Sequence, residues 1–222
     1  MPARTETLDG RTALILAAEQ LFAEYGLHGA SFRQISDAAK QKNGSAIQYH
    51  FGTRDRLVEA VFENRMQNIN PRRLAMLEEI ATAKDTQIRS LVSVLVWPLA
   101  EELRPRAEGN HYLQFLSRAT REKQMVLKLA PWPLMSGWFQ AIEALSGLIS
   151  GLPELIIRQR LLIAADQCVS SLAMFEAEQV GQSPEFSLQV ETLIDMITAA
   201  LLAPVSFQGE TEFKKLRAKP RA

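Results

Sequence analysis

The chain has 222 residues, of which 47% are hydrophobic. This hydrophobic content is enough for a substantial core and argues against wholesale disorder. Lys plus Arg and Asp plus Glu both total 25, so the formal net charge is zero and no global field directs the chain to nucleic acid, membranes or acidic substrates. Cys168 is the only cysteine, which excludes an internal disulfide. The apolar runs end well short of the ~18 residues of a membrane span, and the N-terminus lacks a signal-like apolar segment. We therefore expect a cytoplasmic protein with no membrane partner.

Helical periodicity runs through nearly the whole chain and predicts an all-α fold. The first helix is indicated by one apolar face, formed by Leu14, Ile15, Ala18, Leu21, Phe22 and Tyr25. Gly26 is placed to end this helix. Ser31 and Gln34 have the spacing of a capping box, so a second helix is expected to begin there. A polar segment, 40–44, separates it from a short helix over 45–51.

Longer helices are expected after Gly52 and Thr53, which end the short helix and cap the next one. Their predicted spans are 53–68, 71–83, 85–104, 109–122, 131–150, 153–180 and 186–203. Pro71 sits at a predicted helix start, and Pro98 falls inside an apolar pattern and predicts a kink. The last residues carry five basic side chains and few apolar ones, which is typical of a solvated, mobile end.

The short helix over 45–51 has the pattern of a recognition helix. Ile47 and Phe51 share one face and can pack on the preceding helices, which turns the remaining side chains outward. The outward residues are Ser45, Ala46, Gln48, Tyr49 and His50. Gln can bond adenine in a bidentate way, and Ser or Asn can bond base edges or phosphates. With the helix before it, this segment therefore predicts a helix-turn-helix whose second helix enters a DNA major groove.

Local charge favours the same interpretation. Residues 31–56 contain five basic residues and two acidic ones, a net +3, and the basic residues are Arg33, Lys40, Lys42, Arg54 and Arg56. Ser31 and Thr53 lie at helix N-termini, where free N–H groups favour an anion such as phosphate.

The segments LILAAEQLFAEYG (14–26), SFRQISDAA (31–39) and AIQYHFGTRDRL (46–57) resemble the DNA-binding domain of the TetR family of bacterial transcription regulators. The resemblance covers about a quarter of the chain. It implies that 45–50 is the recognition helix, that Tyr49 contacts phosphate, and that Ser31 and Arg54 hold the DNA backbone. The turn AKQKNGS (39–45) is one residue longer than the family's usual turn, which leaves open whether Asn43, Ser45 or Gln48 meets a base.

The resemblance also implies that the remaining helices bind a small effector and form a homodimer. The middle helices are rich in aromatic and Met side chains, which suits an apolar pocket. The candidate pocket residues are Trp97, His111, Tyr112, Phe115, Met135, Trp138, Phe139, Cys168, Met174 and Phe175. For any one of them ordinary core packing is the simpler interpretation, and Cys168 alone is expected to be a buried small side chain.

The last two long helices are apolar over more than one side and need a second partner. In the last helix the wide stripe comprises Leu188, Leu193, Ile194, Ile197 and Leu201. A bundle made with a second copy supplies that partner and presents two recognition helices to a palindromic operator.

The predicted organisation is a helix-turn-helix DNA-binding domain over 1–52, an effector-binding and dimerisation domain over 53–205, and a basic tail over 206–222. The expected function is a DNA-binding transcriptional regulator, a repressor released by an apolar or aromatic effector, with no enzymatic activity, metal or cofactor. The alternatives are a helical-bundle enzyme and a helical adaptor without DNA binding. The enzyme has little support, because EGNH (108–111) is the only match to the paired Glu-x-x-His motif of di-metal bundles.

Overall fold

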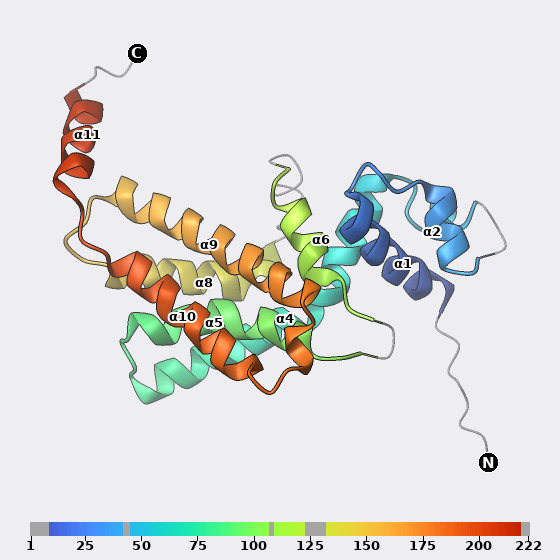
Figure 1. The fold of residues 1–222 in the computed structure, drawn as a ribbon, viewed down its shortest axis with the longest axis horizontal. Helices are drawn as coiled ribbons and strands as arrows, with labels where there is room; N and C mark the ends of the chain where they lie inside the picture. The colour runs from blue at the N-terminus through green and yellow to red at the C-terminus, as the bar shows by residue number, and fades with distance from the viewer. Residues whose placement is uncertain (1–8, 42–44, 107–108, 123–131, 219–222) are drawn as a thin grey trace.

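The computed structural model describes residues 9–41, 45–106, 109–122 and 132–218, and within these ranges the chain is helical and has no β-strand. The molecule is elongated, with helices α1 to α3, here called the head, at one end and helix α11 at the other (Figure 1). Helices α4 to α10 form the body between them. The all-α class predicted from the sequence is confirmed.

The head contains α1 (Gly10–Tyr25), α2 (Phe32–Ala38) and α3 (Ala46–His50). The predicted apolar face of α1 is buried, except that Tyr25 is exposed and Leu21 is partly buried. The predicted capping box is present, because the Gln34 N–H donates to Ser31 Oγ at 3.2 Å and the Ser31 N–H donates to Gln34 Oε1 at 2.8 Å. Thr53 caps the following helix by accepting from the Arg56 N–H at 3.3 Å, also as predicted.

Helix α4 (Arg54–Ala83) is a single helix of 30 residues, whereas the sequence predicted two helices divided at Pro71. An internal proline removes one backbone hydrogen bond and costs about 3 kcal/mol. Packing against α8 offsets that cost: Asn70 donates to the Pro133 carbonyl and to Ser136 Oγ, both at 3.1 Å, and accepts from the Gly137 N–H at 2.9 Å. A Cβ at Gly137 would lie 2.9 Å from Arg73 Cβ, so this glycine permits the close approach.

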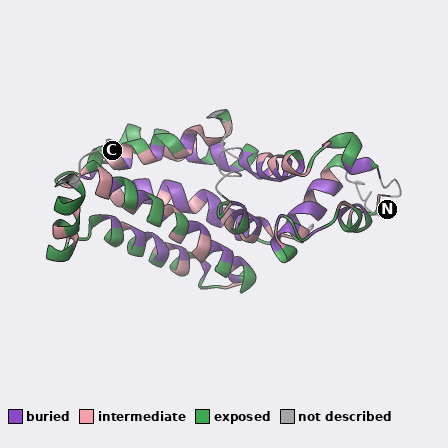
Figure 2. Ribbon diagram, turned by 90° about the horizontal axis from the view of Figure 1, so that it is seen from above, coloured by how far each residue is buried: buried purple, intermediate pink, exposed green. Residues whose placement is uncertain are grey.

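The rest of the body comprises α5 (Ile88–Ala100), η1 (Glu101–Leu103), α6 (Tyr112–Ala119), α8 (Trp132–Leu148), α9 (Glu154–Ala177), η2 (Val180–Gln182) and α10 (Phe186–Leu202). Helix α4 packs on α5 and α8, and α6 packs between α1 of the head and α9. Buried faces turn toward one another between the helices, and exposed residues cover the outside (Figure 2). Helix α5 continues through Pro98.

Helix α10 divides its apolar residues between two faces. Leu193, Ile194, Ile197 and Leu201 are all buried within this chain. Leu188 and Met196 are exposed instead. The sequence-based assignment of Ile197 and Leu201 to a contact with a second copy was therefore wrong, because these side chains complete the core of the same chain.

The C-terminal segment forms helix α11 (Phe207–Ala218), although the sequence predicted a mobile tail over 206–222. Ser206 Oγ accepts from the Gly209 N–H at 3.1 Å at the start of the helix. An ion pair three residues apart, Lys215 to Glu212 at 2.6 Å, supports one of its turns. Phe207 and Leu216 remain largely exposed.

Among the residues that the structure describes, no single helix is long and apolar enough to cross a membrane. Helices α10 and α11 reach the required length and apolar character only when they are taken together, and the chain bends by 58° between them.

Helix α4 ends at Lys84, whose φ of 53° is the left-handed conformation that favours glycine. Because a left-handed conformation is strained for a residue with a Cβ, Lys84→Gly is expected to stabilise the protein by about 1 kcal/mol. Urea unfolding checks this, with Lys84→Ala as the control that keeps the Cβ. An equal gain in both variants would show that the charge of Lys84, rather than its backbone conformation, limits stability.

Candidate nucleic-acid interface and ligand cavity

Helix α3 turns a polar face to solvent. Ser45, Gln48, Tyr49 and His50 are exposed, and Tyr49 is the most open of them at 85%. Ile47 and Phe51 are buried in the core shared with α1 and α2, as the sequence predicted. Ala46, predicted to face outward, is instead 8% exposed, because the first residue of this short helix packs inward. Lys42 and Asn43 lie outside the described residues.

The cations of the head surface differ in availability. Arg33 is exposed on α2, with its Nε 3.9 Å from Asp37, and Arg56 pairs with Glu59 at 2.8 Å. Lys40 is exposed in the turn that follows α2. Ser31 and Thr53 are exposed at the N-termini of α2 and α4, although both hydroxyls serve as helix caps.

Arg54 has an inward structural role that the sequence did not indicate. Its Nη1 donates to the Leu27 carbonyl at 2.8 Å and to the Ala30 carbonyl at 2.7 Å. Its guanidinium also lies over the rings of Phe22 and Phe32, 5.9 and 5.1 Å from their centroids. Arg54 therefore joins the start of α4 to the loop between α1 and α2, and its expected contact with the DNA backbone stays a prediction.

Arg54→Ala is expected to destabilise the protein by about 2 kcal/mol, because two hydrogen bonds from a charged donor are lost. Arg33→Ala is the matched control on the exposed surface, where a change of under about 0.5 kcal/mol is expected. Thermal unfolding of the two variants makes the comparison. If Arg54→Ala is as stable as the parent, the inward hydrogen bonds of Arg54 do not stabilise the fold, and Arg54 behaves as an ordinary surface cation.

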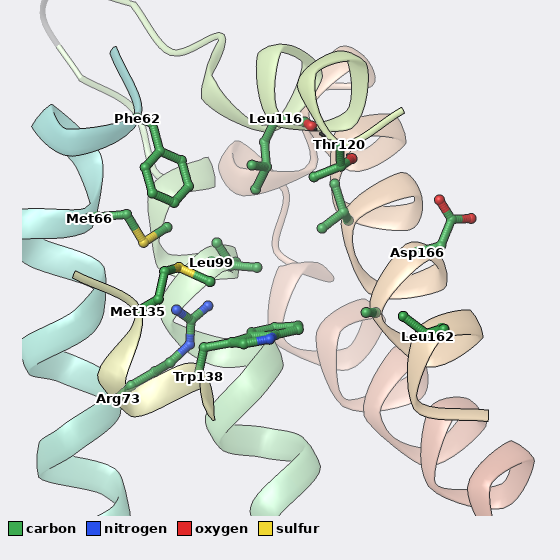
Figure 3. Close-up of a pocket in the computed structure, with 12 residues that line it drawn as sticks. Phe62, Met66, Arg73, Leu99, Leu116, Thr120, Met135, Trp138, Leu162 and Asp166 are labelled. Carbon is green, nitrogen blue, oxygen red and sulfur yellow. Dashed lines mark hydrogen bonds between the residues drawn. The ribbon is translucent and has the colours of Figure 1, made fainter. Parts of the chain in front are cut away.

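The body contains a cavity of about 310 Å³, partly open to solvent, between α4, α5, α6, α8 and α9 (Figure 3). Its lining is mostly apolar and consists of Phe62, Met66, Arg73, Leu99, Leu116, Thr120, Met135, Trp138, Leu162, Ala165, Asp166 and Val169. Apolar walls with a few polar groups are typical of sites for small ligands.

Only Met135 and Trp138 of the predicted pocket residues line this cavity. Trp97 packs edge-on against Phe186, with ring centroids 5.9 Å apart, and its Nε1 donates to Glu191 at 2.9 Å. Phe115 is fully buried and stacks on Phe22 of α1, so it is the next residue, Leu116, that faces the cavity.

The remaining predicted pocket residues also lie elsewhere. The His111 N–H donates to Glu19 at 3.3 Å, and Phe175 packs against the core. Phe139 and Met174 turn toward solvent. Tyr112 and Cys168 are buried outside the lining, and burial raises the pKa of both. The apolar composition of the middle helices indicated a cavity, but it could not indicate which face of each helix meets it.

A cluster of buried charges joins the head to the body, and the sequence analysis missed it. Arg65 of α4 donates from Nη2 and Nε to the two carboxylate oxygens of Glu19 in α1, at 2.6 and 2.7 Å. Its Nη1 lies 3.3 Å from Glu102, which Arg106 also contacts at 2.8 Å. The available signal was an acidic residue, Glu19, inside the stretch 14–23, whose other residues are apolar except Gln20.

A family model described as "Bacterial regulatory proteins, tetR family" matches residues 14–61. No curated protein sequence matches the chain. One similar solved structure concerns the molecular basis for control of antibiotic production by bacterial hormones. Its sequence is 18% identical, the match covers 87% of this chain and 97% of that chain, and the TM-score is 0.48. Another, a putative TetR-family transcriptional regulator from Mesorhizobium loti, is 14% identical, covers 90% of this chain and 98% of that chain, and also has a TM-score of 0.48.

The matched residues 14–61 run from α1 through the exposed face of α3 into the first turns of α4. This is the segment whose capping box, buried anchors and outward polar face form a helix-turn-helix. This part of the chain is therefore similar to the DNA-binding domain of bacterial regulatory proteins of the tetR family, and it supports a DNA-binding transcriptional regulator.

Proposed function

We propose that the protein is a homodimeric repressor that binds a palindromic operator through α3 and is released when a small apolar ligand enters the cavity. The observation that carries this proposal is the position of the cavity. Two of its walls, α4 and α6, lead directly into the head. The proposal includes a DNA-binding domain over 1–52 and a ligand-binding and dimerisation domain over 53–205, and the same arrangement supports this division.

Helix α6 is supported at both ends by residues of other helices. At its start, the Leu113 and Gln114 N–H groups donate to the Glu176 carboxylate of α9, at 3.0 and 2.9 Å. At its end, Arg118 Nε donates to the Ala23 carbonyl of α1 at 2.7 Å. A ligand that displaces Leu116 therefore moves a helix that is bonded directly to the head.

Helix α4 supplies a second connection. Phe62, Met66 and Arg73 line the cavity, and the same helix begins at Thr53 beside α3. A ligand that shifts α4 changes the spacing between the recognition helices of the two subunits, and a palindromic operator is sensitive to that spacing.

A homodimer is supported by apolar side chains that this chain leaves uncovered. Helix α9 exposes Ile163 and Met174, and the adjacent helix α10 exposes Leu188, Met196 and Leu202. Large exposed apolar patches of this kind are characteristic of protein interfaces. A second copy that presents the same helices would bury them in a four-helix bundle.

The experiment is a titration of a ligand found by thermal-shift screening of small apolar compounds, carried out with and without selected operator DNA. We expect operator to weaken the ligand by the same factor by which ligand weakens operator, typically about 5- to 150-fold. Ala165→Phe, which fills the cavity from α9, is expected to lose the ligand and keep DNA binding. Equal ligand affinities in the two titrations would show that the cavity does not regulate DNA binding.

A further inference from the structure

Arg73 is a buried cation on the wall of the cavity. Its side chain is 1% exposed, and its guanidinium lies 5.2 Å from the ring centroid of Trp138. Figure 3 shows the guanidinium between Met135 and Trp138. Among the residues that the structure describes, no acceptor bonds its Nε or its Nη1.

An unpaired cation in this position is costly. Burial lowers the pKa of Arg73 to about 10, although Cys168 and Tyr112 act in the opposite direction. A group with that pKa remains protonated at neutral pH, so the charge persists in the interior. Buried charges in proteins are normally paired, because transfer from water to an apolar interior strongly disfavours an isolated ion.

Arg65, two turns earlier on the same helix, shows how this protein pairs a buried arginine. Its guanidinium meets two carboxylates, Glu19 and Glu102, within 3.3 Å. Arg73 has the same burial and no such partner among the described residues. Within the described ranges, the chain therefore supplies acidic partners for Arg65, beside the head, and none for Arg73, at the cavity.

The rest of the cavity suits the apolar part of a ligand. A volume of about 310 Å³ holds roughly ten non-hydrogen atoms at the density of a liquid in which each water molecule occupies about 30 Å³. Phe62, Met66 and Leu99 form walls near Arg73 (Figure 3). Asp166 is the other charged residue of the lining, and it lies across the cavity on α9 and is exposed to solvent.

We propose that the cavity binds a small monocarboxylate whose carboxylate pairs with Arg73 and whose apolar chain of about eight carbons fills the space between α4, α8 and α9. Arginine matches a carboxylate with two parallel N–H donors, either Nε with Nη2 or Nη1 with Nη2, and each of these pairs includes one of the two nitrogens of Arg73 that have no acceptor among the described residues. This inference specifies the ligand class of the site in the proposed function, but the binding step itself requires no DNA.

The first test is calorimetric titration of the DNA-free protein at neutral pH with three probes of equal chain length: octanoate, octanamide and octylamine. Octanoate is expected to bind roughly tenfold or more tightly than octanamide, because a charge-assisted bond replaces a neutral one. Octylamine, which brings a second cation to Arg73, is expected to bind more weakly than both. Affinities of octanoate and octanamide within twofold of each other would overturn the proposal.

The second test locates the site. Arg73→Met is expected to remove the preference for octanoate over octanamide and to leave the melting temperature of the unligated protein unchanged or higher, because an unpaired buried charge is removed. Arg72→Met is the matched control, since Arg72 is the adjacent residue, is partly exposed and pairs with Glu101. If Arg73→Met still prefers octanoate over octanamide, the carboxylate binds elsewhere and the proposal is overturned. If Arg73→Met does not fold, the comparison of the three probes on the parent protein decides the question.

The outcome is separable from that of the proposed function. Octanoate that binds with the expected preference but leaves operator affinity unchanged supports the carboxylate site and contradicts effector release. A different ligand that releases operator, together with no preference among the three probes, supports effector release and contradicts the carboxylate site.

Discussion

Glu19→Gln is expected to destabilise the protein by about 3 kcal/mol or more, because removal of one partner from a buried ion pair leaves the other charge uncompensated. Glu19 and Arg65 are each 2% exposed, and two bonds of 2.6 and 2.7 Å join them. Glutamine keeps the size of the side chain but loses the charge and one acceptor oxygen. Urea unfolding at pH 7 measures the effect.

Glu102→Gln is the matched control and is expected to cost under about 1 kcal/mol. Burial raises the pKa of Glu102, although Arg106 and Arg65 oppose this. A carboxyl with a raised pKa in the folded state favours folding at low pH, and this contribution is lost as the pH rises through that pKa. Burial therefore makes ionisation of Glu102 harder in the folded protein than in the unfolded chain, so we expect neutral glutamine to be tolerated. If both variants lose the same free energy of unfolding, Glu19 is not the main residue that compensates the charge of Arg65.

Met196→Glu is expected to convert the proposed homodimer to a monomer and to weaken operator binding by roughly 100-fold or more. Met196 is 57% exposed on the outer face of α10, so a glutamate there is compatible with the monomer but places charges at the proposed subunit contact. Loss of the second head removes the gain that comes from binding two half-sites at once, which is typically about 10²- to 10⁴-fold.

The adjacent residue provides the contrast for this prediction. Ile197 points into the core and is 2% exposed, so Ile197→Glu is expected to unfold the chain rather than to produce a folded monomer. Light scattering and circular dichroism distinguish the two results. A parent protein that is itself a folded monomer, or a Met196→Glu variant that remains a dimer, would contradict the proposed assembly.

Local features of the chain could be predicted from the sequence because local physics determines them. The capping box of Ser31, the cap at Thr53 and the buried anchors Ile47 and Phe51 depend on neighbouring residues within one or two turns. The polar outer face of α3 follows from those anchors.

Features that depend on distant residues could not be predicted in the same way. Pro71 indicated a helix end, but the contacts of Asn70 with α8 keep α4 continuous. Arg54 had the sequence signal of a surface cation, and the carbonyls that it bonds lie at least 24 positions away. The buried cation of the cavity, Arg73, was missed because periodicity assigns a face to each helix but does not identify the neighbour that the face meets.

DNA-binding titrations with operator and with mixed-sequence DNA, over a range of salt concentrations, show whether α3 reads DNA. We expect salt-dependent binding to both DNAs, since phosphate contacts release counterions. Gln48→Ala is expected to lose about 1–3 kcal/mol of discrimination between the two, whereas Gln208→Ala, an exposed glutamine on α11 at the far end of the molecule, is expected to match the parent (Figure 1). A parent protein without salt-dependent DNA binding, or a Gln48→Ala variant that discriminates as well as the parent, would contradict the assignment of α3 as the helix that reads DNA.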